Sequence, residues 1–405
     1  GWQFYQDVKI GGDVDLEYPI SWEVGAYYLK EDLDVDVFND FGNTPAGAVA
    51  VLQRDYTQRT DSAGGHFYLA IDLLEELTLD GGFRWNWEEK SFYMKTISAI
   101  PLGEPNFDLE EEWDSPTGTV RLTYRFTESI SSYWKYTRGW KPGSYNATAS
   151  VFTGVTVAKP EVIDSFEWGV AAAWLEDRLT FNGQIFFYAY QDYQIFTAQQ
   201  FLGGTPEFVI LNADDAEVYG AELEASAKLW EGFKFDVRFS WLETQFLDFV
   251  RTDQFLTQNS TGSPITLRAS QNSGNPLLNS PRFKVSLTAS QTLDFDELGA
   301  WTLRWDGVWT DITYFDPTQG VGLGNDDGNT FLPDDTIAMR AHWLHNLRLS
   351  WRSAEERLEA SAWIRNIENT AVKQFAFDGS TFQSTTIYFV GDPRTYGVTF
   401  KVKFF

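Results

Sequence analysis

Apolar and polar residues alternate with a period of two along most of the chain. In the segment 77–88, Leu79 and Trp85 lie on one predicted face, and Asp80 and Arg84 lie on the other. The same alternation recurs in the segments 120–126, 233–241 and 301–309. A period of two is typical of a β-strand with one apolar face. A strand crosses a membrane with about ten residues, so the pattern predicts membrane-spanning strands.

The connections between these segments alternate between short and long. The short ones are acidic or turn-like, and the long ones are rich in Gly, Asn, Asp, Thr and Ser. The long connections lie near residues 34–62, 95–113, 142–160, 197–208, 247–280, 316–341 and 370–393. This alternation predicts an antiparallel meander with short turns at one rim and long connections at the other. Outer-membrane barrels have that asymmetry, with short periplasmic turns and long extracellular loops.

The pattern predicts an all-β chain of about fifteen strands, with strand starts that include Gly65 and Gly118. We expect residues 1–405 to form a single transmembrane β-barrel domain. A closed bacterial barrel normally has an even strand number, and an open edge in lipid leaves backbone groups unpaired. We therefore expect the sequence to be part of a larger barrel that lacks its N-terminal strands.

Composition changes the picture in three ways. Aromatic residues make up 17% of the 405 residues, and no apolar run approaches the length of a membrane helix. The formal net charge of −27 makes nucleic acid an unfavourable partner, because phosphate binding needs clustered Lys and Arg. The absence of cysteine excludes a disulfide framework. A soluble sandwich or propeller is the alternative, but the chain has no blade-length repeat.

Six segments, in order along the chain, resemble the C-terminal barrel of TonB-dependent outer-membrane receptors. They include SSYWKYTRGWKPGSYN, a Pro-Glu…Glu-x-Gly hairpin, LNADDAEVYGAELEA, WIRNIENT and GDPRTYGVTF. The residues that carry the resemblance are Arg138, Gly139, Lys141, Pro142, Gly143, Pro160, Glu161, Glu167, Gly169, Gly220, Glu222, Asn366, Pro393, Arg394 and Gly397. The resemblance spans nearly the whole sequence and implies a wall in the outer membrane of a Gram-negative bacterium.

The resemblance also implies parts that this sequence does not contain. The family closes its barrel with about 22 strands and carries an N-terminal plug preceded by a TonB-binding segment. About fifteen of these strands are expected here, with the plug and the first strands absent. The implied partners are outer-membrane lipid, a small-molecule ligand, the barrel-assembly machinery during insertion, and the TonB complex through the plug.

The last strand is expected to be the one that closes the barrel. Its apolar residues are Tyr396, Val398, Phe400, Val402 and Phe404. These alternate with Lys401 and Lys403, which would face the lumen. The resemblance places a terminal aromatic residue in phase with the lipid-facing set, whereas Phe405 lies one position beyond it.

Catalytic chemistry is not indicated. His66 stands alone, and His342 and His345 are three residues apart, which puts them on opposite faces of a strand. A nucleophile elbow and a phosphate-binding loop are also missing. We therefore expect a protein that is not an enzyme and uses no cofactor.

Acidic clusters occur at residues 31–40, 107–114 and 324–335, in or beside the predicted long connections. Carboxylate and amide oxygens suit Ca²⁺, and Asp326, Asp327 and Asn329 come closest to a calcium site. Their spacing does not match a known calcium loop. A solvated acidic surface is the alternative reading.

Two aromatic residues in a predicted loop are candidates for ligand contact. Trp140 and Tyr145 have ring faces that stack on a sugar, a catecholate or a corrin-like ring. The alternative is the aromatic girdle that lines each membrane interface. Several arginines are expected to face the lumen, namely Arg84, Arg121, Arg125, Arg238, Arg304 and Arg348.

The resemblance implies energised uptake of a scarce nutrient across the outer membrane, with a ferric siderophore as the default substrate. Cobalamin, saccharides and other metal chelates stay open. Two alternatives also stay open: a passive porin or structural adhesin barrel, and a soluble secreted protein that binds glycans.

Overall fold

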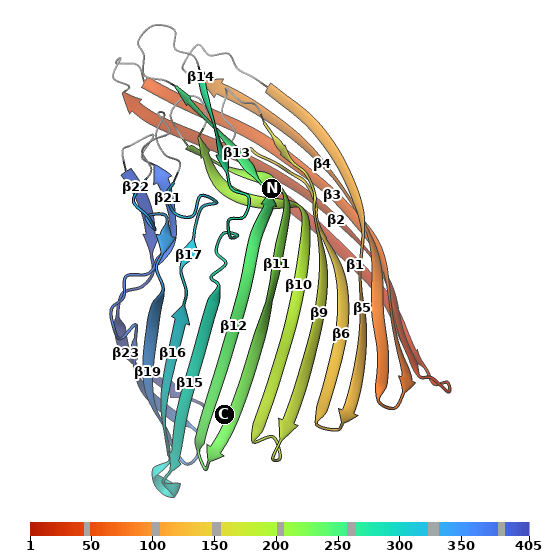
Figure 1. Cartoon of the computed structure of the whole chain (residues 1–405), viewed down its shortest axis with the longest axis vertical. Coiled ribbons are helices and arrows are strands. Elements are labelled where there is room, and N and C mark those ends of the chain that lie inside the picture. Colours follow the sequence, from red (N-terminus) through yellow and green to blue (C-terminus); the bar gives the residue numbers. More distant parts are fainter. Residues whose placement is uncertain are drawn as a thin grey trace.

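The computed structural model describes residues 1–43, 49–98, 106–147, 155–200, 206–256, 265–322, 332–379 and 385–404. These residues build one sheet of fifteen antiparallel strands, which confirms the expected strand number (Figure 1). Within the described residues, β1 and β23 are the two edges of the sheet, so the wall is curved but open. No helix within these ranges is long and apolar enough to cross a membrane.

The strands of the sheet follow the chain in order. They are β1 (Trp2–Val14), β2 (Ile20–Asn43), β3 (Val49–Leu74), β4 (Leu77–Ser98), β5 (Asn106–Thr127), β6 (Ile130–Lys141), β9 (Glu161–Trp174), β10 (Leu179–Gln200), β11 (Pro206–Trp230), β12 (Phe233–Asp248), β15 (Phe283–Asp294), β16 (Ala300–Thr310), β19 (His342–Arg352), β20 (Leu358–Arg365) and β23 (Thr395–Val402).

Short turns join the strands at one end of the sheet and long connections join them at the other (Figure 1). The long connections contain four small hairpins. One 3₁₀ turn lies in a short connection. These elements are β7 (Ser144–Tyr145) with β8 (Val157–Ala158), β13 (Val250–Leu256) with β14 (Ile265–Gln271), β17 (Thr313–Tyr314) with β18 (Ala338–Met339), β21 (Lys373–Gly379) with β22 (Thr385–Val390), and η1 (Asp296–Leu298).

Three of the expected long connections consist largely of paired strand. Residues 34–62 and 95–113 are mostly continuations of β2–β3 and β4–β5, which stay paired up to Asn43↔Val49 and Lys95↔Asn106. Most of 197–208 likewise belongs to β10 and β11. These strands are longer than a membrane-spanning strand needs to be. Their ends outside the membrane carry the acidic residues that suggested loops.

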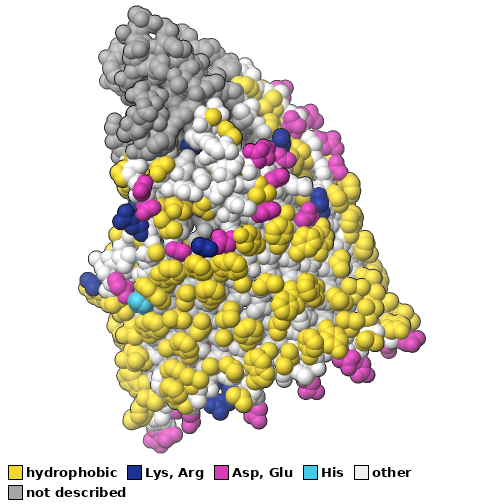
Figure 2. Space-filling view, viewed as in Figure 1, with side chains coloured by type: hydrophobic (Ala, Val, Ile, Leu, Met, Phe, Trp, Pro, Cys, Tyr) yellow, Lys and Arg dark blue, Asp and Glu magenta, His cyan; other side chains and the backbone are white. Residues whose placement is uncertain are grey.

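The pairing register gives the sheet two chemically distinct faces. Along one register line, Phe67, Phe83 and Gly118 share what we call the apolar face. On the other side, the polar face, His66 lies opposite Arg84. Apolar side chains form a broad band across the view in Figure 2, with most charged side chains above and below the band. Such a band is the surface that a barrel presents to lipid.

The final strand has the predicted arrangement. Tyr396, Val398 and Phe400 point to the apolar face and are 79%, 68% and 76% exposed. Val402 is half exposed and Phe404 is exposed, whereas Phe405 lies outside the described residues. On the polar face, Lys401 is the register partner of Glu359.

Buried apolar residues gather near the end with long connections, because the strands below have one face toward the lumen and one toward lipid. The largest cluster contains Phe186, Ile195, Ala213, Ala216, Val218, Phe246, Phe249 and Leu277. A second one joins Phe315, Ile337, Met339 and Ala376 from two long connections. A third joins Phe92, Met94 and Tyr145. The buried apolar clusters therefore hold the long connections in place at this rim of the sheet.

Candidate ligand-binding rim and lumen wall

The connection between β6 and β9 is fastened to β10 and β11 by buried polar side chains. Gln194, which is buried, donates hydrogen bonds to the carbonyl oxygens of Pro142 (2.9 Å) and Lys159 (2.8 Å). The carboxylate of Glu161 accepts a hydrogen bond from the backbone N–H of Gln194 (2.6 Å). Asn146 exchanges two hydrogen bonds with the backbone of Ile210 (2.8 and 2.9 Å). Pro142 and Glu161, which carry the family resemblance, therefore take part in the contacts that hold this part of the rim.

Tyr145 does not have the open ring face that ligand contact needs. It is 5% exposed, its ring lies 5.1 Å from that of Phe92, and its hydroxyl donates to the carbonyl of Lys90 (3.1 Å). Burial raises its pKa to about 12, with smaller contributions from Glu111 and Glu110. The expected ligand contact is wrong for Tyr145 in this structure, because the ring is used to bind the rim to β4.

Trp140 lies within β6, near the end of the strand, and not in the loop in which the sequence placed it. The register places it on the apolar face, the side on which Trp134 and Tyr136 also lie. This position agrees with the girdle interpretation, in which an aromatic ring marks the membrane boundary. The structure thus separates the two candidates: Tyr145 is buried and Trp140 faces outward.

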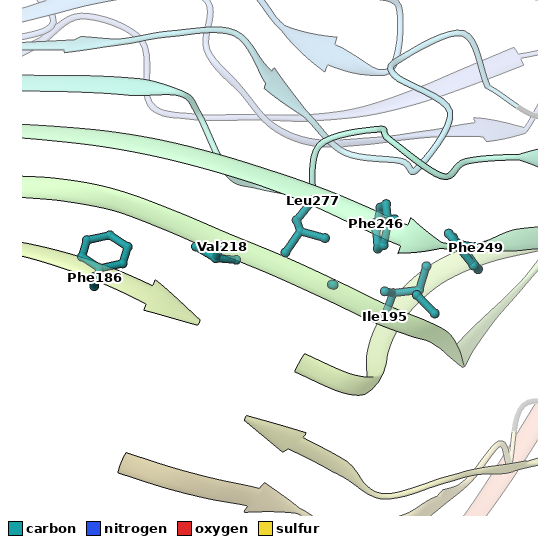
Figure 3. Close-up of a cluster of buried hydrophobic side chains, with 8 residues drawn as sticks. Phe186, Ile195, Val218, Phe246, Phe249 and Leu277 are labelled. Atoms are coloured by element: carbon teal, nitrogen blue, oxygen red, sulfur yellow. The ribbon is translucent and has the colours of Figure 1, made fainter. Parts of the chain in front are cut away.

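An apolar cluster covers the upper part of the sheet between β10 and β12 (Figure 3). Leu277, from the connection after β14, lies over these strands beside Val218 and Phe246. Its backbone N–H donates to the hydroxyl of Thr244 (2.9 Å), which holds the connection on the strands. The sequence did not reveal this cluster, because its members come from four separate segments.

Three long connections meet at a buried charged cluster. Arg251 is 2% exposed, and Asp378 is 3% exposed. Both line a cavity of about 10 Å³ together with Asp316. The Asp316 carboxylate accepts hydrogen bonds from the backbone N–H groups of Thr318 (3.1 Å) and Gly320 (3.0 Å). Burial raises the pKa of this carboxyl, and the hydrogen bond from Gly320 and the charge of Arg251 oppose that rise.

The polar face carries a ladder of ion pairs. Arg121 pairs with Asp80, Arg238 with Glu224, Arg304 with Asp306, Arg348 with Glu359, and Lys135 with Glu167, at distances of 2.9, 2.8, 2.7, 3.9 and 3.3 Å. Arg125 donates instead to the carbonyl of Glu75 (2.8 Å). The arginines expected to face the lumen therefore lie on the polar face with partners inside the wall. Each such pair neutralises charge locally, although exposed pairs contribute little to stability.

A polar recess of about 770 Å³ opens on the polar face between β1 and β6. Glu23 in this recess lies 3.4 Å from Nε2 of His66 and 3.6 Å from Nζ of Lys9. The guanidinium of Arg84 lies 4.1 Å from the centre of the Tyr27 ring, a cation–π contact. Its Nε atom is buried and makes no hydrogen bond to any described atom. This recess can accept a polar partner from the lumen side.

Two more of the resemblance-carrying segments meet at the rim near β20 and β23. Asn366 donates from its side chain to the carbonyls of Thr370 (2.9 Å) and Asp392 (3.3 Å). Arg394 donates to the carbonyl of Ile367 (3.2 Å), and its backbone N–H donates to Asn369 (2.9 Å). WIRNIENT and GDPRTYGVTF thus form one folded corner.

The remaining resemblance-carrying residues lie mostly within strands. Gly169, Gly220 and Glu222 are on the polar face, where Glu222 accepts a hydrogen bond from Gln184 (2.9 Å). Lys141 is the register partner of Glu161 at the end of β6. Gly139 lies in β6, and Gly143 follows that strand. Pro160 precedes β9, and Pro393 precedes β23, which contains Gly397.

Histidines and acids form no metal site in the described part of the chain, where no group of three or more metal-binding side chains converges. His345 instead stacks between Trp305 and Trp343, at ring distances of 5.5 and 5.2 Å, and contacts Glu368. His342 is on the opposite face by register, as expected from the spacing. Asp326, Asp327 and Asn329 lie outside the described residues, so the calcium hypothesis stays a prediction.

Comparison with protein families decides the class. The model of the family described as "TonB dependent receptor-like, beta-barrel" matches residues 2–367. The chain belongs to this family. It is thus a transmembrane wall of an outer-membrane receptor of Gram-negative bacteria and not an enzyme, and its apolar face is the surface toward lipid.

Curated and solved relatives agree with the family. The chain is 21% identical over 339 residues to the pesticin receptor of Yersinia pestis, which covers 83% of this chain and 43% of that receptor. The ferric yersiniabactin uptake receptor FyuA from Yersinia pestis has a TM-score of 0.75 at 17% identity, covering 100% of this chain and 54% of that one. The siderophore receptor PiuA from Acinetobacter baumannii has a TM-score of 0.72 at 15% identity, covering 98% and 55%. The chain spans about half the length of these relatives.

Proposed function

We propose that this chain forms most of the wall of a receptor that takes up a ferric siderophore across the outer membrane, driven by TonB. Family membership over residues 2–367 is the observation that carries the proposal. The names of the solved relatives, which include receptors for ferric yersiniabactin and for siderophores, support an iron chelate as the substrate class. In this proposal the substrate binds at the rim with long connections, and the wall performs no catalysis.

The geometry supports a role for the polar face as the contact surface of a plug domain outside this sequence. The polar recess near Glu23 and His66 offers the charged groups of Glu23 and Lys9 to a lumen-side partner. A plug that donates and accepts hydrogen bonds there would rest on a fixed surface, because the neighbouring ion pairs already hold their side chains. The proposed partners are thus a plug, TonB through that plug, and the barrel-assembly machinery during insertion.

The test uses the gene for the full-length protein that contains this chain. A deletion strain, the complemented strain and a complemented strain without TonB would receive radiolabelled iron as ferric yersiniabactin, ferric citrate or a ferric catecholate. We expect uptake of one chelate to fall at least tenfold in the deletion strain and in the strain without TonB. Uptake that survives the loss of TonB would identify a passive pore, and unchanged uptake of every chelate would overturn the siderophore assignment.

A further inference from the structure

A groove of about 430 Å³ lies on the apolar face of β3 to β6. It is on the opposite side of the sheet from the ion pairs and the polar recess of the lumen wall. Phe67, Leu79, Phe83 and Val120 are among the side chains that line it. Its floor includes Gly118, where an added Cβ would lie 2.6 Å from the carbonyl oxygen of Gly82. A side chain cannot fill the floor without moving the backbone, so the groove is a built feature of the wall.

The groove opens toward the membrane. Phe67 and Val120 are 52% and 54% exposed on the face that the register assigns to lipid. An apolar groove in that position is filled by hydrocarbon, since water would find almost no polar partner along its walls. The shape and chemistry therefore select an acyl chain as the occupant.

Arg138 lies at the edge of the same groove, beside Tyr136. It is eight residues from Ile130, where β6 begins at the end with short turns. Because a spanning strand uses about nine to eleven residues, Arg138 is at the opposite membrane boundary, the level of lipid headgroups. A guanidinium at this level can reach the phosphate of a lipid whose chain lies in the groove.

The hydrogen bonds of Arg138 leave donors for such a phosphate. Its Nη1 atom lies 3.2 and 3.1 Å from the two carboxylate oxygens of Asp164, which also accepts a hydrogen bond from the hydroxyl of Tyr136 (2.6 Å). The Nε atom is buried and has no hydrogen-bond partner among the described atoms. The side chain is 36% exposed and its Nη2 atom is not among the buried atoms, so Nη2 can donate to the phosphate of a lipid.

We propose that the groove binds one acyl chain of a phosphate-bearing lipid, whose phosphate accepts hydrogen bonds from Arg138. Asp164 and Tyr136 hold the guanidinium in place at the boundary. The position differs from those of other basic side chains on this face: Lys30 has two hydrogen bonds to Asp61 (3.0 and 2.9 Å) and does not line the groove. The proposed site is independent of the transported substrate.

The test measures lipid bound to the full-length receptor in dodecyl maltoside by native mass spectrometry. Phosphatidic acid is the probe, and diacylglycerol with the same chains is the matched lipid without phosphate. We expect the receptor to retain phosphatidic acid at least fivefold more than diacylglycerol. Arg138→Gln should remove that preference, and Val120→Trp, which fills the groove, should lower the retention of both lipids.

Two matched variants serve as controls. Arg59→Gln changes an outer-face arginine that pairs with Asp32 away from the groove, and Leu303→Trp adds an indole to the apolar face of β16. Both should retain phosphatidic acid as the unmodified receptor does. Equal retention by Arg138→Gln and the unmodified receptor, or equal loss in the control variants, would overturn the proposed site. A change of heat-modified gel mobility would identify a variant that has not folded, and Arg138→Met, which also removes the charge, then replaces Arg138→Gln.

Discussion

Glu161 on β9 accepts a 2.6 Å hydrogen bond from the backbone N–H of Gln194 on β10. The side chain of Gln194 in turn reaches both ends of the connection between β6 and β9. One carboxylate thus fixes the backbone of the residue that secures a rim segment. This relationship explains why a glutamate and a glutamine, far apart in sequence and without any catalytic function, are both needed at the rim.

Replacing Glu161 tests that relationship. Glu161→Ala should leave the buried N–H of Gln194 unpaired and cost about 1–3 kcal/mol of local stability. Glu161→Gln keeps an acceptor oxygen for that N–H and should behave almost as the unmodified receptor. Limited proteolysis of intact outer membranes would measure the effect, with cleavage within 142–160 several times faster in Glu161→Ala only. Equal cleavage in both variants would contradict the prediction.

A pH dependence is expected from Tyr145. Its folded-state pKa of about 12 exceeds the ordinary value of 10.0, so the folded state holds the phenolic proton more tightly than the unfolded state does. The resulting stability is complete below about pH 10 and is lost as pH rises toward 12, by up to about 2 kcal/mol. Denaturant unfolding of the receptor between pH 9 and 12 would show this slope.

Tyr145→Phe is the control for that experiment. It keeps the ring against Phe92 but loses the hydrogen bond to Lys90, so it should cost about 1 kcal/mol at neutral pH. Its stability should then decline less steeply above pH 10 than that of the unmodified receptor. Identical slopes would mean that other groups account for the alkaline transition.

Removing the basic member of an ion pair should be costly only where its acidic partner is buried. The side chain of Asp80 is 8% exposed and depends on Arg121, so Arg121→Ala should destabilise the wall by about 1–3 kcal/mol. On the outer face, Arg59 pairs with Asp32 at the same distance, 2.9 Å, but Asp32 is 17% exposed and Arg59 itself 62%. Arg59→Ala should cost less than about 1 kcal/mol. The temperature at which folded receptor changes its gel mobility would compare the two, and a larger effect of Arg59→Ala would refute the argument.

Two glycines in strands should differ sharply in their tolerance of a methyl group. A Cβ at Gly220 would collide with the backbone carbonyl of Trp241 on the neighbouring strand, whereas at Gly65 the nearest atom is 4.0 Å away. Gly220→Ala should therefore cost about 1–3 kcal/mol through backbone displacement. Gly65→Ala should change stability by less than about 0.5 kcal/mol. Refolding yield into detergent micelles and the unfolding midpoint would report both, and similar values would exclude close strand approach as the reason for Gly220.

Much of the wall could be predicted because a strand between lipid and lumen alternates apolar and polar residues, and this alternation is visible in the sequence. The starts of β3 and β5 were wrong for a physical reason. β5 begins well before Gly118, in the acidic stretch 106–114. β3 begins well before Gly65, in a polar stretch whose Arg59 is matched with Asp32 only across strands. A sequence does not reveal the register that brings such charges together. A charged segment of a paired strand therefore cannot be told from a solvated loop by sequence alone.

The candidate site was harder to predict than the fold. Tyr145 resembled an exposed aromatic residue because nothing near it in sequence indicates burial, and the ring that covers it, Phe92, lies on β4. Glu161 was recognised through family resemblance, but its hydrogen bond to Gln194 depends on the alignment of β9 with β10. By contrast, the arginines on the polar face followed directly from the alternation, which sets the side of the sheet without any tertiary information.

The buried charged cluster of Arg251, Asp316 and Asp378 joins three long connections that are distant in sequence. The cluster itself is buried, but it holds these connections side by side, so an antibody against this part of the rim would recognise several connections together, in a discontinuous epitope. Immunisation with a peptide from any one connection would present its residues without the neighbours that shape them. Antigens or diagnostic reagents built on this surface would need the folded wall.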